Sequence, residues 1–186
     1  MGQYYTPVIR KGRTDYDIYN SHNYDNGLKL TEHSYIGNNF VDTVLKELYN
    51  KPAELAWVGD YAEPDDVSNP EADKFIIAQT GESYRKPVGS NGEFMIDKVV
   101  INRSKNEYVD LAEYVKVTPA DKWIDVPINP IPLLTAIGNG RGGGDYHGTN
   151  MDKIGYWACD TIEVKDAKDL PSGLKNITGD VAFVEG

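Results

Sequence analysis

Cysteine is nearly absent from this sequence of 186 residues, in which Cys159 is the single example. One thiol excludes an internal disulfide framework and is typical of a protein from a reducing compartment. Long hydrophobic runs are missing too, since no apolar stretch approaches the ~18 residues of a membrane-spanning helix. The opening residues, MGQYYTPVIRKGR, lack the apolar segment of a secretory signal peptide. We therefore expect a cytoplasmic protein that does not contact a membrane.

Basic residues are also scarce, with 19 Lys and Arg against 29 Asp and Glu and a formal net charge of −10. Their one cluster is RKGR at 10–13, whereas binding a nucleic-acid backbone needs a basic stripe. We therefore expect no direct nucleic-acid binding. An acidic surface attracts basic surfaces, including those of proteins that bind nucleic acids. Negative charge that only serves solubility is the alternative.

The motifs of common enzyme classes are missing as well. No Gly-Lys-Ser/Thr closes a Walker loop, and no Gly-x-Ser-x-Gly forms a nucleophile elbow. The only thiol, Cys159, has apolar neighbours that suggest burial, and a buried, unassisted thiol is inert. The sequence therefore favours a binding protein over an enzyme, and it predicts no cofactor.

Among the patterns that are present, one segment has helical periodicity and the others resemble strands. The helix is expected at about 38–50, where apolar residues recur at i, i+3, i+4 and i+7 after a capping asparagine. The sequence predicts an α+β fold, a β-rich single domain over 1–186 with a mostly antiparallel sheet and this one main helix. We expect hairpins of 3–9 with 15–20 and of 93–102 with 107–117, further strands at 54–61, 74–80, 131–137 and 154–166, a polar turn region at 81–92, and an edge or tail strand at 180–186.

The segment from Gly138 to Gly148 contains six glycines. Its G-x-G-x-x-G spelling matches a dinucleotide fingerprint, but that motif needs a helix N-terminus for the pyrophosphate, and no apolar helical pattern follows. Glycine-rich backbone can also turn its N–H groups toward an anion, and Arg141 could grip a phosphate or carboxylate. Close backbone packing and a mobile lid are the alternatives. The candidate ligand or anion site comprises Gly138, Gly140, Arg141, Gly142, Gly143, Gly144, Asp145 and His147.

Carboxylates crowd the stretch from Glu54 to Asp73, which contains no lysine or arginine. Such a stretch could imitate a phosphate backbone toward a basic partner, or bind Ca²⁺ loosely, although its spacing is not that of an EF-hand. A solvated loop is the alternative. The candidate partner-binding residues are Asp60, Glu63, Asp65, Asp66, Glu71 and Asp73.

Two histidines flank a turn signal at Asp25-Asn26-Gly27. His22, Asp25 and His33 are residue types that bind zinc or another transition metal. No HExxH or CxxC spacing supports such a site, so we predict no metal and keep these three residues as weak candidates. Hydrogen bonding to loop backbone is their more ordinary role. If the histidines converged with the Arg141 loop, the set would have the parts for acid–base chemistry on an anion.

Three segments together resemble a known family: MGQYYTPVI, YDNGLKLTEHSYIGNN, and PLLTAIGNGRGGGDYHG followed by IGYWACD. They are similar to small acidic proteins of gut bacteria and of their phages and mobile elements, roughly over 1–164. The glycine-arginine segment is the most specific part. No activity, fold or catalytic residue comes with this family. The resemblance implies an intracellular accessory protein carried by phage, a context in which small acidic proteins often inhibit host nucleic-acid machinery, including CRISPR effectors.

These observations predict a non-enzymatic interaction protein. It would present acidic, tyrosine-rich surface, with the Arg141 loop as a second contact element, to a basic partner such as a nucleic-acid-binding host protein. A phage-borne, anti-CRISPR-like inhibitor of a host defence complex is the most concrete form of this hypothesis. The alternative is a small-molecule, nucleotide or anion-binding protein, or a small hydrolase, that uses the loop Gly138–Gly144 with Arg141.

Overall fold

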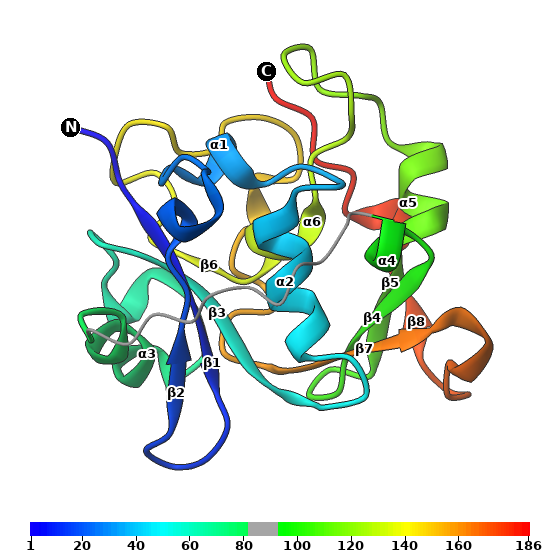
Figure 1. The fold of residues 1–186 in the computed structure, drawn as a ribbon, viewed down its shortest axis with the longest axis horizontal. Helices are drawn as coiled ribbons and strands as arrows, with labels where there is room; N and C mark the ends of the chain where they lie inside the picture. The colour runs from blue at the N-terminus through cyan, green and yellow to red at the C-terminus, as the bar shows by residue number, and fades with distance from the viewer. Residues whose placement is uncertain (82–92) are drawn as a thin grey trace.

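The computed structural model describes residues 1–81 and 93–186, so the expected polar turn at 81–92 lies, apart from Gly81, outside the described residues. An eight-stranded sheet forms the centre, in the order β2-β1-β3-β7-β4-β5-β8, with β6 beside β3 (Figure 1). The β3–β6 and β5–β8 pairs are parallel and the other pairs are antiparallel. The strands are β1 (Tyr5–Arg10), β2 (Tyr16–Ile18), β3 (Ala53–Gly59), β4 (Lys98–Asn102), β5 (Glu107–Asp110), β6 (Ala136–Ile137), β7 (Thr161–Asp166) and β8 (Lys175–Asn176).

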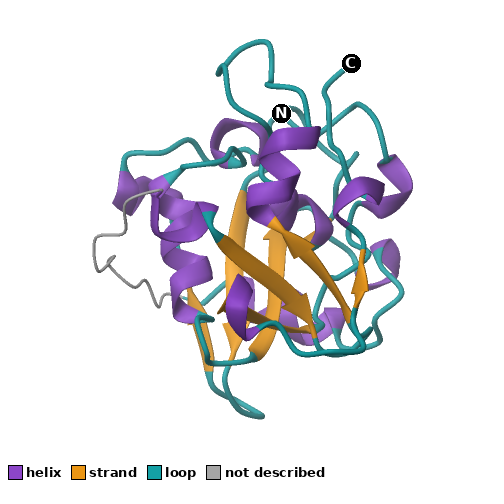
Figure 2. Cartoon of the chain, turned by 90° about the vertical axis from the view of Figure 1, so that its right-hand side faces the viewer, coloured by secondary structure: helices purple, strands orange, loops and turns teal. Residues whose placement is uncertain are grey.

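Helices surround this sheet, and Figure 2 shows the strands in the middle of the molecule with helices around them. Three of the described helices have seven or more residues, so the expected main helix at 38–50 has two companions. The α-helices are α1 (Leu30–His33), α2 (Asn39–Glu47), α3 (Ala72–Gln79), α4 (Glu93–Ile96), α5 (Leu111–Val117) and α6 (Pro130–Leu134). The 3-10 helices are η1 (Ser21–Tyr24), η2 (Pro64–Asp66), η3 (Met151–Lys153), η4 (Ala167–Asp169) and η5 (Thr178–Asp180).

Strand β3 divides the core in two because its successive side chains point to opposite faces of the sheet. Leu55 and Trp57 belong to the larger hydrophobic cluster, together with the apolar face of α2. Ala56 and Val58 belong to a smaller cluster that includes Phe75 of α3. Both faces of this strand are therefore covered, which explains why its sequence is an almost unbroken apolar run.

The expected helix and both expected hairpins are confirmed. The Asn38 side chain accepts hydrogen bonds from the N–H groups of Phe40 and Val41, and α2 begins at Asn39 as this cap requires. Strand β1 pairs with β2, and β4 pairs with β5. The α+β class with a mostly antiparallel sheet is confirmed with them.

Two expected strands are helical for most of their length. The segment 74–80 lies in α3, where the 3.6-residue period buries Ala72 and Phe75. The segment 131–137 begins in α6 and is extended only in β6. Asn129 caps α6, and Pro130 sits at its first position, which favours a helix start. These start signals outweigh the strand-like composition of the apolar runs.

The other expected strands are shorter than their patterns suggested. In 107–117, the Asp110 side chain caps a helix by accepting from the Glu113 N–H, so only β5 is extended. The segment 93–102 starts as α4, and 154–166 is a series of turns before β7. The expected edge strand at 180–186 makes only an isolated bridge between Gly148 and Glu185.

Candidate functional site

The glycine-rich segment is folded around its own aspartate. The Asp145 side chain, 4% exposed, accepts hydrogen bonds from the Gly140 N–H at 2.7 Å and the Gly142 N–H at 3.0 Å. It also accepts one from the Gln3 amide at 2.9 Å and one from the Tyr5 hydroxyl at 3.1 Å. The backbone amides converge on an anion, as glycine-rich nests do, and that anion is the carboxylate of Asp145.

Glycine is needed here for two separate reasons. Gly140 has φ +97°, a conformation that side chains with a Cβ rarely adopt. At Gly142 a Cβ would lie 2.8 Å from the Gln3 backbone nitrogen, so the N-terminal segment passes directly against the loop. Gln3 is fully buried and also donates to the Gly138 carbonyl at 2.7 Å. Neither Gln3 nor Tyr5 belonged to the sequence-based site, because nothing local in the sequence links them to a segment more than 130 residues away.

The Arg141 side chain does not take part in the nest. It forms ion pairs with two carboxylates of the acidic stretch. Its guanidinium donates to both oxygens of Asp66 at 2.9 Å and to Glu63 at 3.1 Å. These carboxylates raise the pKa of Arg141, with the hydrogen bond to Asp66 as the largest cause. The glycine segment and the acidic stretch, predicted as two separate sites, therefore touch through this residue.

The acidic segment, defined as residues 60–73, consists of turns, η2 and the start of α3. Glu71 points toward Arg10 and Lys74 and forms ion pairs with both. Asp60 is exposed and accepts from the Tyr4 N–H at 2.9 Å. Asp65 and Asp73 are also exposed. Within the described part of the chain, these three aspartates form no ion pair.

We expect Arg141→Gln to loosen the acidic segment while leaving the fold intact. Arg141 is partly exposed, and exposed ion pairs contribute little to global stability. The melting temperature should therefore change little, whereas amide hydrogen exchange at Glu63–Asp66 should accelerate because the guanidinium tie is gone. Lys165→Gln, which removes an ion pair with Glu163 on β7, is the control. A large fall in melting temperature, or unchanged exchange at η2, would contradict this expectation.

The three histidines do not converge on Arg141. His33 is completely buried, its Nδ1 lies 3.0 Å from the Gly27 carbonyl, and its Nε2 accepts from the Trp57 indole at 2.9 Å. Burial lowers the pKa of His33 to about 4, so the ring is neutral and both nitrogens are occupied. His22 lies exposed on η1, and His147 is exposed beyond the nest. Over 1–81 and 93–186, no hydrogen bond or ion pair joins a histidine side chain to Arg141 or Asp145.

The weak metal candidates are separated in the same way. Asp25 ends η1 in a left-handed conformation, while the His33 ring points into the core. No three His, Cys, Asp or Glu side chains gather to hold a metal ion anywhere in the described chain. Cys159 is 3% exposed, and burial, then the charge of Asp160, raises the pKa of its thiol. A buried thiol with a raised pKa is a poor nucleophile.

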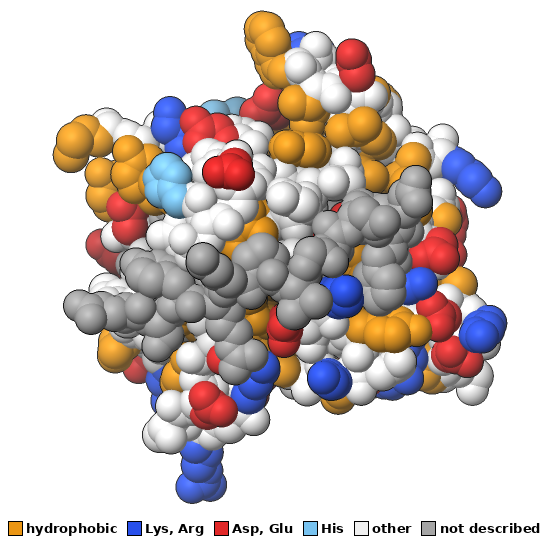
Figure 3. Space-filling view, in the orientation of Figure 1, with side chains coloured by type: hydrophobic (Ala, Val, Ile, Leu, Met, Phe, Trp, Pro, Cys, Tyr) orange, Lys and Arg blue, Asp and Glu red, His pale blue; other side chains and the backbone are white. Residues whose placement is uncertain are grey.

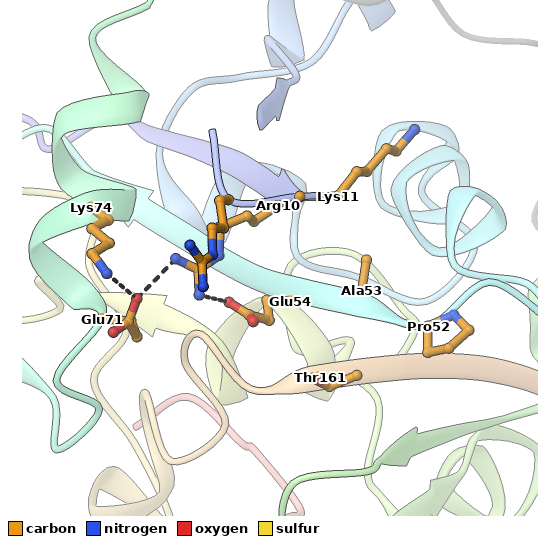
Figure 4. Close-up of a pocket in the computed structure, with 10 residues that line it drawn as sticks. Arg10, Lys11, Pro52, Ala53, Glu54, Glu71, Lys74 and Thr161 are labelled. Carbon is orange, nitrogen blue, oxygen red and sulfur yellow. Dashed lines mark hydrogen bonds and ion pairs between the residues drawn. The ribbon is translucent and has the colours of Figure 1, made fainter. Parts of the chain in front are cut away.

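A wide cavity of about 820 Å³ opens beside the β1–β2 hairpin, and Figure 4 shows the ion pairs along its wall. Arg10 lies between Glu54 and Glu71, and Lys74 approaches Glu71 at 2.7 Å. Lys11 pairs with Asp17 of β2 and with Glu47 of α2. Two of the three basic residues in the cluster at 10–13, Arg10 and Lys11, are therefore paired with carboxylates.

Nothing in the described chain forms a helix with the length and apolar character needed to cross a membrane. Compared with models of known protein families, with curated proteins and with solved structures, the chain matches none of them. The resemblance to small acidic phage and gut-bacterial proteins therefore stays a prediction.

Proposed function

We propose that this chain is a non-enzymatic interaction protein that binds a basic partner through its acidic segment. The observation that carries the proposal is the pair of salt bridges from Arg141 to the carboxylates of Glu63 and Asp66. It holds the segment against the fold while Asp60, Asp65 and Asp73 remain exposed to solvent. A binding surface that is ordered beforehand loses less conformational entropy on association, and the net charge of −10 attracts a basic surface from a distance.

The contacts within the glycine segment favour this function over the alternative of ligand binding at Gly138–Gly144. An incoming anion would have to displace the Asp145 carboxylate from the Gly140 and Gly142 amides. It would also compete with Glu63 and Asp66 for Arg141. An anion bound next to these carboxylates would be repelled by them.

The double variant Asp65→Lys with Asp73→Lys tests the acidic segment directly. Neither aspartate forms an ion pair within the described residues, so their reversal should not unfold the protein. Affinity for a short polylysine peptide, measured by calorimetry at low salt, should fall at least tenfold, because each reversal removes an attraction of roughly 0.5–1 kcal/mol and adds a repulsion. The effect should shrink as salt is added.

Asp169→Lys with Asp180→Lys is the matched control, because both aspartates are exposed and lie outside the acidic segment. It changes the net charge by the same amount. If both double variants weaken polylysine binding equally, the charge acts only as a diffuse field and the acidic segment is not the binding surface.

The finer form of the proposal concerns the partner. A basic groove that holds nucleic acid has the charge that complements a group of exposed carboxylates. Together with the family resemblance, this supports a cytoplasmic inhibitor of a host nucleic-acid-handling defence complex. Such an inhibitor should compete with nucleic acid for its target, and the Asp65→Lys with Asp73→Lys variant should lose that competition. Native mass spectrometry of the protein from its own type of host cell would identify the target.

A further inference from the structure

A second candidate site lies where the loop joining α5 to α6 folds over the chain's C-terminal end. Figure 1 shows this loop at the top of the molecule beside the C-terminus, away from α3 at the left. It encloses a cavity of about 300 Å³, at the lower end of the range for small-molecule sites. Hydrophobic and acidic side chains lie together over this part of the surface in Figure 3. We refer to the cavity as the Trp123 pocket.

The wall of the Trp123 pocket is apolar in part. Ile128 and Leu133 line it from the core side and are almost completely buried. At its mouth, the Trp123 side chain is 78% exposed, the highest exposure of any tryptophan in the chain. An exposed indole beside an apolar cavity offers both a flat contact surface and an electron-rich ring face.

Two carboxylates face the same pocket. Asp121 is 8% exposed, and one of its oxygens accepts from the backbone N–H of Trp123 at 2.8 Å. Glu185 lines the pocket from the C-terminal segment, and burial, then the nearby charge of Asp121, raises its pKa. Lys122 and His147 oppose that rise, but the Lys122 ammonium also donates to the Gly186 carbonyl. The pocket thus has two like charges, and a bound cation would reduce the repulsion between them.

The Ser34 hydroxyl is an independent sign of a missing partner. Ser34 is 2% exposed and lines the pocket, yet its Oγ has no hydrogen-bond partner among the described residues. Leaving a buried polar atom unsatisfied costs stability, and native structures usually supply a partner for it. Its backbone is satisfied, since the Ser34 carbonyl accepts from the Asn129 N–H at 3.1 Å. A ligand donor in the pocket would satisfy the hydroxyl as well.

We infer that the Trp123 pocket binds an alkylguanidinium, the group that ends an arginine side chain. A planar guanidinium stacks on an indole, donates to carboxylates in a fork and is weakly hydrated. The alkyl stem suits the apolar wall, and the Ser34 hydroxyl can accept one of the remaining N–H groups. A hard metal ion fits poorly, because two carboxylates among apolar walls do not provide its six or more oxygen ligands. This inference is independent of the acidic segment.

The test uses n-butylguanidinium as the probe and n-butylurea as its uncharged counterpart of nearly the same shape. Binding is followed by the NMR signal of the Trp123 indole N–H, assigned with Trp123→Phe. We expect butylguanidinium to shift this signal with millimolar affinity and butylurea to bind at least tenfold more weakly. Glu185→Gln and Ser34→Ala should each weaken butylguanidinium binding about three- to tenfold, and Ser34→Ala should not lower the melting temperature. Asp152→Asn, an exposed acidic position on η3, should bind like the wild type.

Further arms of the experiment distinguish the source of the guanidinium. A capped glycine-rich peptide with one central arginine should bind more tightly than butylguanidinium if the natural ligand is a protein side chain, and no more tightly if it is a free small molecule. The same peptide with citrulline in place of arginine should not bind in either case. The inference is overturned if butylurea and butylguanidinium bind equally, if Glu185→Gln has no effect, or if only a neutral disaccharide shifts the Trp123 signal.

Discussion

Asp145→Ala is expected to destabilise the protein by about 4 kcal/mol or more, because it removes at once the acceptor of four donors, two of them buried and two partly buried. The Gly140 and Gly142 amides, the Gln3 amide and the Tyr5 hydroxyl all donate to this carboxylate. Each hydrogen bond to a charged group contributes about 1.5–3 kcal/mol, and the contributions do not simply add. Since whole domains are stable by only ~5–15 kcal/mol, the variant should be close to unfolding at 37 °C. Urea denaturation at 25 °C measures the difference.

Two further variants separate the charge of Asp145 from its shape. Asp145→Asn keeps the size of the side chain but places an NH₂ group against one set of donors, so it should be nearly as harmful as alanine. Asp152→Ala on the exposed surface should change the stability by less than about 0.5 kcal/mol. If Asp145→Asn is tolerated as well as Asp152→Ala, the nest does not depend on its internal carboxylate and is available to an external anion.

The structure around Asp145 also illustrates which parts of the fold could be read from the sequence. Local patterns identified α2, the two hairpins and the buried strand β3, because caps, turn residues and apolar periodicity act over a few positions. The error at α6 has a local origin too. Asn129 and Pro130 form a helix start that an apolar, β-rich composition concealed. Short apolar segments are ambiguous between helix and strand unless such end signals are weighed first.

The candidate site is built from contacts between residues far apart in the sequence, and local sequence patterns do not predict such contacts. The glycines of 138–148 suggested backbone amides that converge on an external anion; two of these amides donate instead to Asp145 of the same segment. That the Arg141 side chain would pair with Glu63 and Asp66, 75 or more positions away, has no local signal. The Trp123 pocket was missed for the same reason, since Ser34, Trp123 and Glu185 come from three distant parts of the chain.

Asp42→Asn is expected to stabilise the protein at pH 8 by about 2–4 kcal/mol and to leave it almost unchanged near pH 4. Asp42 lies in the first turn of α2 and is 2% exposed, and one of its carboxylate oxygens has no hydrogen-bond partner within the described residues. Burial raises its pKa from 3.8 to about 7. The folded state therefore binds a proton that the unfolded state has released, and this contribution to stability is lost as the pH rises from about 4 to 7.

The titration of His33 changes the free energy of unfolding in the opposite direction over nearly the same pH range. Burial lowers its pKa from 6.5 to about 4, so the unfolded state takes up a proton first, and stability is lost as the pH falls from 6.5 to 4. With Asp42 and His33 both present, their opposite contributions to the pH dependence of the free energy of unfolding largely cancel. In Asp42→Asn the pH dependence due to His33 should dominate, and the free energy of unfolding should rise by about 3 kcal/mol between pH 4 and 6.5.

The exposed Asp73, which occupies the first turn of α3 as Asp42 does in α2, provides the control for this experiment. Asp73→Asn removes the same charge from the first turn of a helix without relieving a buried carboxylate, so it should change stability by a few tenths of a kcal/mol at every pH. Urea midpoints from pH 4 to 8 compare the three proteins. A gain from Asp42→Asn that is the same at pH 5 and pH 8 would mean that Asp42 does not titrate in this range, and the cancellation with His33 would then be wrong.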